Sequence, residues 1–569
     1  MVSEPYIKEF SYSQDGVNSI NSLQISDNEQ NHYIRNYPTV YVINDEKKDK
    51  YDVYVGETNN IVQRTLQHLN ADPKNRDDWD GLKKAKNPNM YVIAHDHFNK
   101  SLTLDVENRL MLYLGSSPYV NRINNRRTNG QGEYFPVEEL DEIFGKIWRK
   151  LNKRNQNLFP AMEVIKNEAI FKASPFHKLT AEQSQAKFTI SNKIREILSD
   201  SKSVDEHLIM VTGDAGAGKT VLLSSLFYDL TQDDESRDVH LMVNHDEQIK
   251  VYQTISKKLG LDVSKVTKPT SFINKYSKNN KADVALVDEA HLLWTQGHLG
   301  YKGSNQLNDL LKRAKVVIAI FDANQILRNQ QILSNEQIKK LREKALNTGD
   351  LIELHNQLRM QASDSTINWI KNLIEDQTIG ILPEDDSYKV KVFDTPQQLE
   401  DAIDYENVLD VDSDYKNGIS RLVATYDWPY VAKGKDVYKV KIGNWELPWN
   451  YQIKEHPKIV NYQDLSWAER PQTIKEVGSI YTIQGFDLNY VGVILGPSIK
   501  YRDGKIIFDK SVHFNKDVTN NRTMENGEKK NFGEELIKNE MNVLMTRGVH
   551  GLFIYAVDEA LREKLKSSV

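Results

Sequence analysis

The sequence predicts an α/β protein in which a small α+β domain precedes two parallel-sheet domains. The main observation is a glycine-rich loop that joins an apolar run at 208–211 to a second apolar run at 221–227. Further apolar runs at 239–243, 284–287 and 315–321 alternate with helix-like segments, which is typical of a parallel sheet covered by helices. Closer to the N-terminus, two short β-like runs separated by a polar turn predict an antiparallel hairpin and therefore a different, smaller fold.

The length of 569 residues is enough for about three or four domains, each with its own core. Hydrophobic residues make up 39% of the chain and charged residues 27%, which is the composition of a folded globular protein. We therefore expect a polar leader over 1–30, a small α+β domain over 31–136, a helical connector over 137–175, and two parallel-sheet domains over 176–350 and 351–569.

The composition also excludes several classes of protein. The chain has no cysteine, which rules out disulfides, thiolate zinc sites and iron–sulfur clusters. No apolar run approaches the length of a membrane span, and the first residues lack a signal pattern, so we expect no membrane association and a cytoplasmic location. The net charge is −6, so a nucleic-acid partner would need local basic patches.

The glycine-rich loop has the sequence Gly213-Asp214-Ala215-Gly216-Ala217-Gly218-Lys219-Thr220. Its three glycines, Gly213, Gly216 and Gly218, let successive backbone N–H groups and the start of the next helix point at an anion. Lys219 can then reach the β- and γ-phosphates, and Thr220 can offer its hydroxyl to Mg²⁺. The loop therefore predicts a nucleoside-triphosphate site with a magnesium ion.

Two carboxylates follow the apolar strand 284–287 and complete this prediction. Asp288 at the strand end can hold Mg²⁺ through water, and Glu289 can orient the water that attacks the γ-phosphate. Upstream, Gln183 is placed to read adenine, because its amide offers both a donor and an acceptor, and this favours ATP over GTP. The alternative for the same stretch is a helix start capped by Thr180.

Motifs after residue 320 resemble those of superfamily 1 helicases, whose motors contain two RecA-like domains. Gln325 resembles the γ-phosphate sensor, and Arg359 and Arg547 resemble arginines that the second domain supplies to the ATP site. The stretch 479–487 resembles the motif in which threonine and Gln484-Gly485 contact the nucleic-acid backbone.

Two further stretches resemble a narrower family. Residues 421–428 and the aromatic-rich segment 444–450 look like the bacterial ATPase family related to the helicase-like domain of Schlafen proteins. The aromatic side chains in these stretches either stack on bases or close a small core, and we favour core packing.

The N-terminal domain resembles the GIY-YIG nucleases. The motif residues, in order, are Thr39-Val40-Tyr41, Tyr54-Val55-Gly56-Glu57-Thr58, Arg64 and His68. The polar residues 45–50 are expected to form the turn of the hairpin, and Asn59-Asn60 to open the helix that carries Arg64 and His68.

The resemblance implies the chemistry of this domain. Glu107 would bind one divalent metal ion, Mg²⁺ or Mn²⁺, and Arg64 would hold the phosphate. Tyr41 or Tyr54 would relay or accept a proton from the attacking water, with assistance from His68. These residue types are the ones that phosphodiester hydrolysis requires.

Other positions are less settled. The family's asparagine is assigned to Asn121, with Asn124 as the second candidate, in a basic loop at 121–130 that either contacts phosphates or is simply solvated. Two positions depart from the family pattern: Thr39 replaces its first glycine, and Glu57 stands where several relatives carry a cation.

Together these motifs predict an ATP-dependent nucleic-acid-processing enzyme, in which a helicase-like motor is joined to a metal-dependent endonuclease. DNA is favoured as substrate, and the architecture suggests bacterial antiviral defence or repair. One alternative is an ATP-binding regulatory switch whose nuclease-like domain recognises nucleic acid without cutting it. The other is the same architecture acting on RNA, and the sequence has no module that reads a 2′-hydroxyl to decide between the two substrates.

Overall fold

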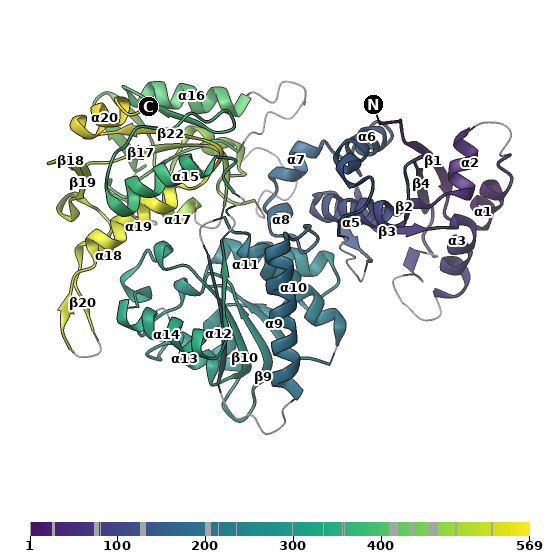
Figure 1. Cartoon of the computed structure of the whole chain (residues 1–569), viewed down its shortest axis with the longest axis horizontal. Helices are drawn as coiled ribbons and strands as arrows, with labels where there is room; N and C mark the ends of the chain where they lie inside the picture. The colour runs from purple at the N-terminus through teal and green to yellow at the C-terminus, as the bar shows by residue number, and fades with distance from the viewer. Residues whose placement is uncertain are drawn as a thin grey trace. The chain divides into compact units, whose positions relative to one another are not determined.

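The computed structural model describes residues 2–24, 29–72, 79, 81–82, 84–125, 132–199, 206–213, 216–234, 236–298, 300–333, 335–355, 357, 359–408, 419–431, 437–450, 452–453, 465–483, 486–524 and 527–569. The chain divides into two compact units (Figure 1). Unit 1 comprises Met1–Ser184, Ser224–Ser236 and Val251–Val266, and unit 2 comprises Gln185–Leu223, Arg237–Lys250 and Thr267–Val569.

Unit 1 contains a five-stranded sheet in the order β1-β4-β2-β3-β5. The strands are β1 (Tyr6–Ser11), β2 (Thr39–Lys47), β3 (Lys50–Thr58), β4 (Asn89–Ala94) and β5 (Val120–Ile123). The pairing of β3 with β5 is parallel, and the other pairings are antiparallel.

The predicted hairpin is confirmed as β2 and β3, but its turn is shorter than the predicted turn at 45–50. Only Lys48 and Asp49 separate the strands, and both have positive φ values of 51° and 65°. Positive φ at both central residues is the geometry of a two-residue turn that matches the twist of the flanking strands. The strands can therefore continue further into the polar stretch than the sequence suggests.

Helices cover both faces of this sheet. In Figure 1, α1 (Gln14–Asn21), α2 (Glu29–Asn36) and α3 (Ile61–Asn70) lie on one face, and α5 (Lys100–Ser116) and α6 (Leu140–Asn152) lie on the other. The first seven residues of β2 are all buried, as expected for a central strand covered on both sides. This arrangement places the motif residues of β2, β3 and α3 in the interior of unit 1.

The expected polar leader over 1–30 needs correction, because residues 6–11 form a strand of the sheet. Strand β1 pairs with β4 along its whole length, and α1 follows it. Basic residues of α6 and of the turn after it hold the segment in place: Lys146 donates to the carbonyl of Val2, Lys150 to that of Pro5 and Arg154 to that of Ile7. Two further short helices, α7 (Met162–Asn167) and α8 (Ala169–Lys172), follow α6. The other domain boundaries stay predictions.

Unit 2 contains two parallel sheets. The first has the order β11-β6-β10-β9-β7-β8, and the pairings among its first five strands are all parallel. Its strands are β6 (His207–Gly213), β7 (Val239–Met242), β8 (Val266–Thr267), β9 (Ala282–Val287), β10 (Ala314–Phe321) and β11 (Leu351–Leu354). The helices of this region are α9 (Ala181–Ser199), α10 (Lys219–Asp233), α11 (Asp246–Lys258), α12 (Pro269–Lys275), α13 (Gln306–Leu311) and α14 (Asn335–Asn347).

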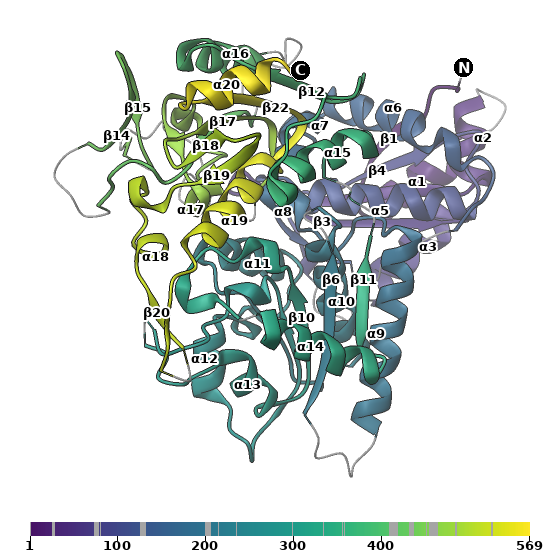
Figure 2. The same ribbon diagram turned by 60° about the vertical axis from the view of Figure 1, so that its left-hand side comes forward.

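The second sheet has the order β12-β22-β17-β13-β16 and is parallel throughout. Its strands are β12 (Lys389–Val392), β13 (Arg421–Ala424), β16 (Val477–Gly478), β17 (Leu488–Leu495) and β22 (Gly548–Ala556). In Figure 2, α16 (Pro396–Val408) and α20 (Glu559–Lys566) lie on one side of β17 and β22, and α15 (Asp364–Lys371) and α19 (Gly533–Met545) lie on the other. The predicted fold class is therefore confirmed.

The aromatic segment at 444–450 contributes to the core of this second sheet. Strands β14 (Lys439–Ile442) and β15 (Trp445–Pro448) form a hairpin, and Trp445 and Trp449 are buried in one cluster with Tyr426 and Trp428. Core packing, the favoured alternative, is what the structure shows. In the described part of the chain, no helix is both long and apolar enough to cross a membrane.

Candidate active sites

Three of the predicted nuclease residues meet inside unit 1. Tyr41 comes from β2, Tyr54 from β3 and His68 from α3, and all three are buried. The ring centroids of the two tyrosines lie 6.1 Å apart, and the Tyr54 ring lies 5.3 Å from that of His68. Tyr41 Oη is 2.7 Å from His68 Nε2, which is a hydrogen bond. Residues far apart in the sequence thus form one buried polar cluster.

Gly56 makes room for this cluster. A Cβ atom at this position would lie 2.4 Å from Tyr41 Oη and 2.9 Å from a ring carbon of Tyr54. No side chain fits at such distances, so only glycine lets the Tyr41 hydroxyl approach the β3 backbone. The position of the Tyr41 hydroxyl therefore requires a glycine at residue 56.

Glu107, on α5, lies among other charged groups. Burial, and then the negative charge of Glu57, raise the pKa of Glu107 to about 8, while the charges of Lys100 and Arg64 act in the opposite direction. Glu57 forms an ion pair with Lys100 and accepts a hydrogen bond from Thr103. Glu57 and Glu107 bring two carboxylates into one region, and carboxylate oxygens are ligands that suit a hard divalent cation. The residues present therefore fit the predicted metal ion.

The Tyr41 phenol is strongly held in its neutral form. Burial, and then the neighbouring Tyr54, raise the pKa of Tyr41 well above its ordinary value, although Arg64 acts in the opposite direction. Arg64 itself lies on α3, where its Nη1 donates to Gln67 Oε1 at 2.9 Å. A free tyrosinate is thus not available at neutral pH, and any proton that Tyr41 takes up must be matched by one that it gives away.

The structure does not bring Asn121 to this cluster. Its side chain is exposed on β5 and donates to Asp52 Oδ1 at 3.1 Å, near the start of β3. Asn124 is buried, and its backbone N–H bonds to the carbonyl of Val53. Asn125 instead makes two hydrogen bonds to the backbone of Val55: its Nδ2 donates at 2.6 Å, and its Oδ1 accepts at 3.0 Å. The asparagine that supports the motif strand is therefore Asn125.

Sequence reasoning also missed two neighbours of His68. Asp72 Oδ2 lies 2.5 Å from His68 Nδ1, and the Trp79 ring stacks on the imidazole with a centroid distance of 3.7 Å. Asp72 stands four residues after His68, a spacing at which helical side chains meet, so the pair could have been found from the sequence. Trp79 carries no comparable signal.

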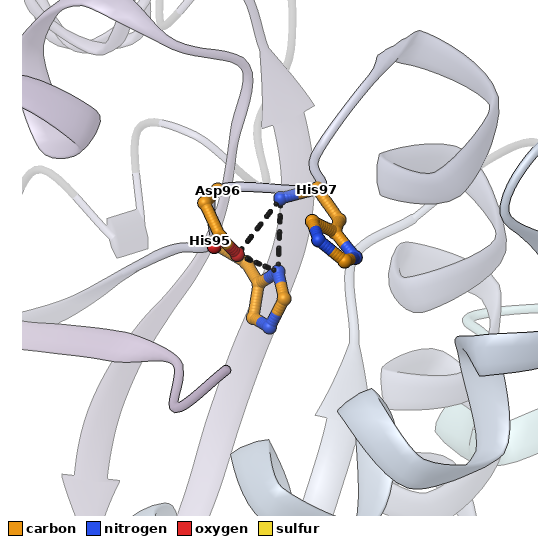
Figure 3. A group of neighbouring side chains, drawn as sticks. All are labelled: His95, Asp96 and His97. Atoms are coloured by element: carbon orange, nitrogen blue, oxygen red, sulfur yellow. Dashed lines mark hydrogen bonds and ion pairs between the residues drawn. The ribbon is translucent and has the colours of Figure 1, made fainter. Parts of the chain in front are cut away.

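A histidine–aspartate cluster follows β4 and resembles a metal site at first sight. Figure 3 shows His95, Asp96 and His97, whose potential ligand atoms lie within 4.8 Å of one another. His95 Nδ1 already accepts the backbone N–H of His97, and His95 Nε2 lies 3.2 Å from the carbonyl of Ser3. His97 Nδ1 bonds to Glu139 at 2.5 Å. These bonds close the turn after β4 and hold the N-terminal segment, and we assign no metal here.

In unit 2, two glycines in the glycine-rich loop at 213–220, below called the phosphate loop, adopt a conformation that favours glycine. Gly216 and Gly218 have φ values of +89° and +71°, which other residues rarely adopt. Lys219 opens α10, and its buried ammonium donates to the carbonyl of Gly213 at 2.5 Å and to Asp322 Oδ2 at 3.4 Å. Residues 214 and 215 lie outside the described residues. Backbone N–H groups at the start of a helix that follows such a loop are suited to binding an anion.

Asp288 lies at the end of β9 beside Thr220. Its Oδ2 is 3.4 Å from Thr220 Oγ1 and accepts a hydrogen bond from Gln248 Nε2 at 2.8 Å. Glu289 follows with a positive φ of 48°, and its Oε2 lies 3.2 Å from Nε2 of the buried His291. The hydroxyl and the carboxylate that were predicted to hold Mg²⁺ are thus adjacent.

A chain of side chains joins the two parallel sheets of unit 2. Asp322 Oδ2, next to Lys219, accepts from Gln325 Nε2 at 2.7 Å, and Gln325 Oε1 accepts from Arg547 Nη2 at 3.1 Å. Burial alone would raise the pKa of Asp322, but the charges of Lys219 and His291 and the hydrogen bond from Gln325 hold it below its usual value. Burial lowers the pKa of Arg547 to about 10.

Arg359, which resembles an arginine that the second domain supplies to the ATP site, lies close to Gly216 of the phosphate loop. A Cβ atom on Gly216 would lie 2.5 Å from the Arg359 Cβ, so the two backbones are in close approach. Arg359 Nε pairs with Asp487 Oδ1 at 2.5 Å. Several predicted positions lie outside the described residues. They are residues 356 and 358 just before Arg359, Gln484 and Gly485 in the stretch 479–487, and 126–130 of the basic loop.

Gln183 forms a helix cap in this structure. Its Oε1 accepts from the backbone N–H of Thr180 at 3.0 Å, and Thr180 Oγ1 accepts from the backbone N–H of Gln183 at 3.2 Å. This reciprocal pair is a capping box, the alternative that the sequence left open. The adenine-reading role of Gln183 stays a prediction.

Residues 206–558, more than half of the chain, match the family model described as Schlafen group 3, DNA/RNA helicase domain. The chain belongs to the Schlafen group 3 helicase family. In this Schlafen group 3 protein, residues 37–123 also match the model of the GIY-YIG catalytic domain. The chain therefore combines a GIY-YIG nuclease domain with a helicase domain.

The Schlafen group 3 chain is also similar to the uncharacterized protein YPL245W of Saccharomyces cerevisiae. The two are 34% identical over 442 residues, which is 71% of this chain and 93% of the yeast protein. This relative is a yeast protein, so it does not support the bacterial origin that the sequence suggested.

Solved structures of viral helicases match more distantly. Arterivirus nonstructural protein 10 (helicase), in complex with DNA and alone, is 14% identical, with a TM-score of 0.27, and the match covers 66% of this chain. The helicase of PRRSV has the same identity and TM-score over 65% of this chain. The matches span only 65%, 64% and 56% of those viral chains.

The two asparagines give a test of the arrangement around β3. We expect Asn125→Ala to lower the free energy of unfolding by about 2–4 kcal/mol, because it leaves the buried N–H and carbonyl of Val55 without their partner. The exposed Asn121→Ala should change it by no more than about 0.5 kcal/mol. Urea titration measures both values, and equal losses in the two variants would contradict the assignment.

Proposed function

We propose that this chain is an ATP-dependent nucleic-acid-processing enzyme, in which the helicase-like motor hydrolyses ATP and the GIY-YIG domain cuts a phosphodiester. The observation that carries the proposal is the continuous chain of contacts from Lys219 through Asp322 and Gln325 to Arg547. It joins Lys219 of the phosphate loop to Arg547, which lies just before β22 of the second sheet. Such an arrangement makes ATP hydrolysis depend on the closure of two domains.

Each group at the motor site has a role in hydrolysis. The loop backbone and Lys219 bind the phosphates, and Glu289 orients the attacking water. Arg359 and Arg547 stabilise the charge that develops on the γ-phosphate. A bound Mg²⁺, held by Thr220 and Asp288, would neutralise charge on the phosphate oxygens. The distance of 3.4 Å between Thr220 Oγ1 and Asp288 Oδ2 supports this role.

At the nuclease site, Arg64 would bind the scissile phosphate, and Tyr41 with His68 would handle the proton of the attacking water. Glu107 would hold Mg²⁺ or Mn²⁺, which would withdraw negative charge from the phosphate oxygens. The burial of Glu107 beside Glu57 supports a cation there. Tyr54 packs against the same groups and would help to position them.

We favour DNA over RNA as the substrate, and a role in antiviral defence or repair. A nuclease tethered to a motor is suited to removing foreign or damaged DNA, and this step rests on architecture alone. RNA is the alternative substrate, and a 2′-hydroxyl contact would be the feature that distinguishes it from DNA.

A second function is favoured by one feature of the nuclease domain. Glu57 stands where several relatives of the motif carry a cation, and Thr39 replaces the first glycine. A non-cutting domain that recognises nucleic acid, governed by an ATP-driven switch, would show these departures. Nucleic-acid binding without divalent-dependent scission would favour this switch over the nuclease.

The motor is tested at Lys219. We expect Lys219→Ala to reduce ATP hydrolysis by at least about 100-fold, because the variant loses the cation that contacts the β- and γ-phosphates. Phosphate release with and without single-stranded DNA measures the effect. The exposed Lys278→Ala is the matched control. Hydrolysis within about threefold of wild type in Lys219→Ala would contradict the site.

The nuclease is tested at Glu107. We expect Glu107→Gln to abolish divalent-dependent cutting while ATP hydrolysis stays unchanged, because the two reactions use separate sites. Gel electrophoresis of a labelled duplex and a labelled single strand measures cutting, and the exposed Glu138→Gln serves as control. If Glu107→Gln still cuts with Mg²⁺ or Mn²⁺, the assignment of Glu107 is wrong.

A further inference from the structure

Asp72 completes a line of three side chains that begins at Tyr41. Asp72 Oδ2 is 2.5 Å from His68 Nδ1, and His68 Nε2 is 2.7 Å from Tyr41 Oη. The imidazole between them is fully buried and is stacked on Trp79 at 3.7 Å, with an interplanar angle of 15°. The ring therefore cannot turn without breaking both hydrogen bonds and the stacking contact.

The donor and acceptor roles along this line follow from the groups themselves. An ionised carboxylate can only accept hydrogen bonds, so His68 Nδ1 must carry the proton that bonds to Asp72. In the neutral imidazole, Nε2 then has only a lone pair, and it must accept the hydroxyl proton of Tyr41. The arrangement has the logic of a serine–histidine–aspartate triad, with a phenol in the place of the serine hydroxyl.

Asp72 is itself held in position. Its Oδ1 lies 3.4 Å from Gln67 Nε2, and Gln67 Oε1 accepts from Arg64 Nη1 at 2.9 Å. Arg64, Gln67 and His68 all lie on α3, and Asp72 follows just after the helix ends. The phosphate-binding arginine and the Tyr41–His68 pair are thus joined through one carboxylate.

We propose that Asp72 is a positioning residue of the nuclease reaction: it fixes the tautomer of His68 and stabilises the imidazolium that forms when His68 takes the proton of Tyr41. In the step itself, the water oxygen bonds to phosphorus while its proton passes to Tyr41 Oη, and the phenol proton passes to His68 Nε2. The bond from phosphorus to the leaving oxygen breaks, and that oxygen takes a proton from solvent water. This inference rests on the proposed cutting by unit 1.

The test compares Asp72→Asn with Asp141→Asn in the full-length protein. Asp141 is a matched control, because its side chain is 86% exposed on α6, where it pairs with Arg109. The tautomer is read from the ¹⁵N shifts of the imidazole nitrogens in histidine-labelled protein, with the His68 signals identified from the spectrum of His68→Gln. Cutting is measured as the single-turnover rate on a labelled DNA strand with Mn²⁺.

In wild type and Asp141→Asn we expect the Nδ1–H tautomer of His68, and in Asp72→Asn a shift to Nε2–H, because an asparagine amide can donate to Nδ1. The cutting rate of Asp72→Asn should fall about 10²- to 10⁴-fold, and Asp72→Glu should recover part of it. Equal thermal unfolding of Asp72→Asn and Asp141→Asn would exclude a folding defect.

Two results would overturn the inference: an Nε2–H tautomer in the wild type, or a cutting rate of Asp72→Asn within twofold of wild type. A wild type that cuts no DNA would instead contradict the proposed nuclease. The tautomer measurement then decides by itself whether Asp72 orients His68.

Discussion

The buried carboxylate of Asp322 is the point on which the architecture of unit 2 depends. It lies between Lys219 of the phosphate loop and Gln325, and Gln325 bonds to Arg547 just before β22 of the second sheet. A buried carboxylate is costly unless cations and donors surround it, and here Lys219 and Gln325 supply them, while Gln325 also accepts a hydrogen bond from Arg547. Through Gln325, the carboxylate of Asp322 therefore connects Lys219 of the phosphate loop to Arg547 of the second domain. A change of charge at the loop on hydrolysis would act directly on these contacts.

In unit 1, the corresponding constraint is the burial of the Tyr41 phenol beside a hydrogen-bond partner. Gly56 leaves the space for the Tyr41 hydroxyl, and the hydrogen bond to His68 gives the phenol proton an acceptor. Asn125 holds the intervening strand from the opposite edge. Because the site is assembled from a central hairpin covered by helices on both faces, its groups are fixed by packing rather than by loops.

Much of this could be predicted from the sequence, because the signals are local. The phosphate loop, Asp288 and the β2–β3 hairpin each show in a short run of residues. The other features depend on which strands pair and in which register, and a short run of residues does not show this. The choice between Asn121 and Asn125 depends on where β5 meets β3. Strand β1 was missed because only one of its six residues is buried, which leaves a polar pattern. Gln183 fits a cap and an adenine reader equally well in sequence.

One measurement tests the central claim most directly. The purified chain is incubated with plasmid, linear duplex and single-stranded DNA and with RNA, with Mg²⁺ or Mn²⁺, with and without ATP, while phosphate release and strand scission are followed in the same samples. A nucleic-acid-processing enzyme predicts ATP hydrolysis stimulated by at least one of these nucleic acids, together with divalent-dependent scission. Hydrolysis that no nucleic acid stimulates, with every strand left intact, would contradict the account.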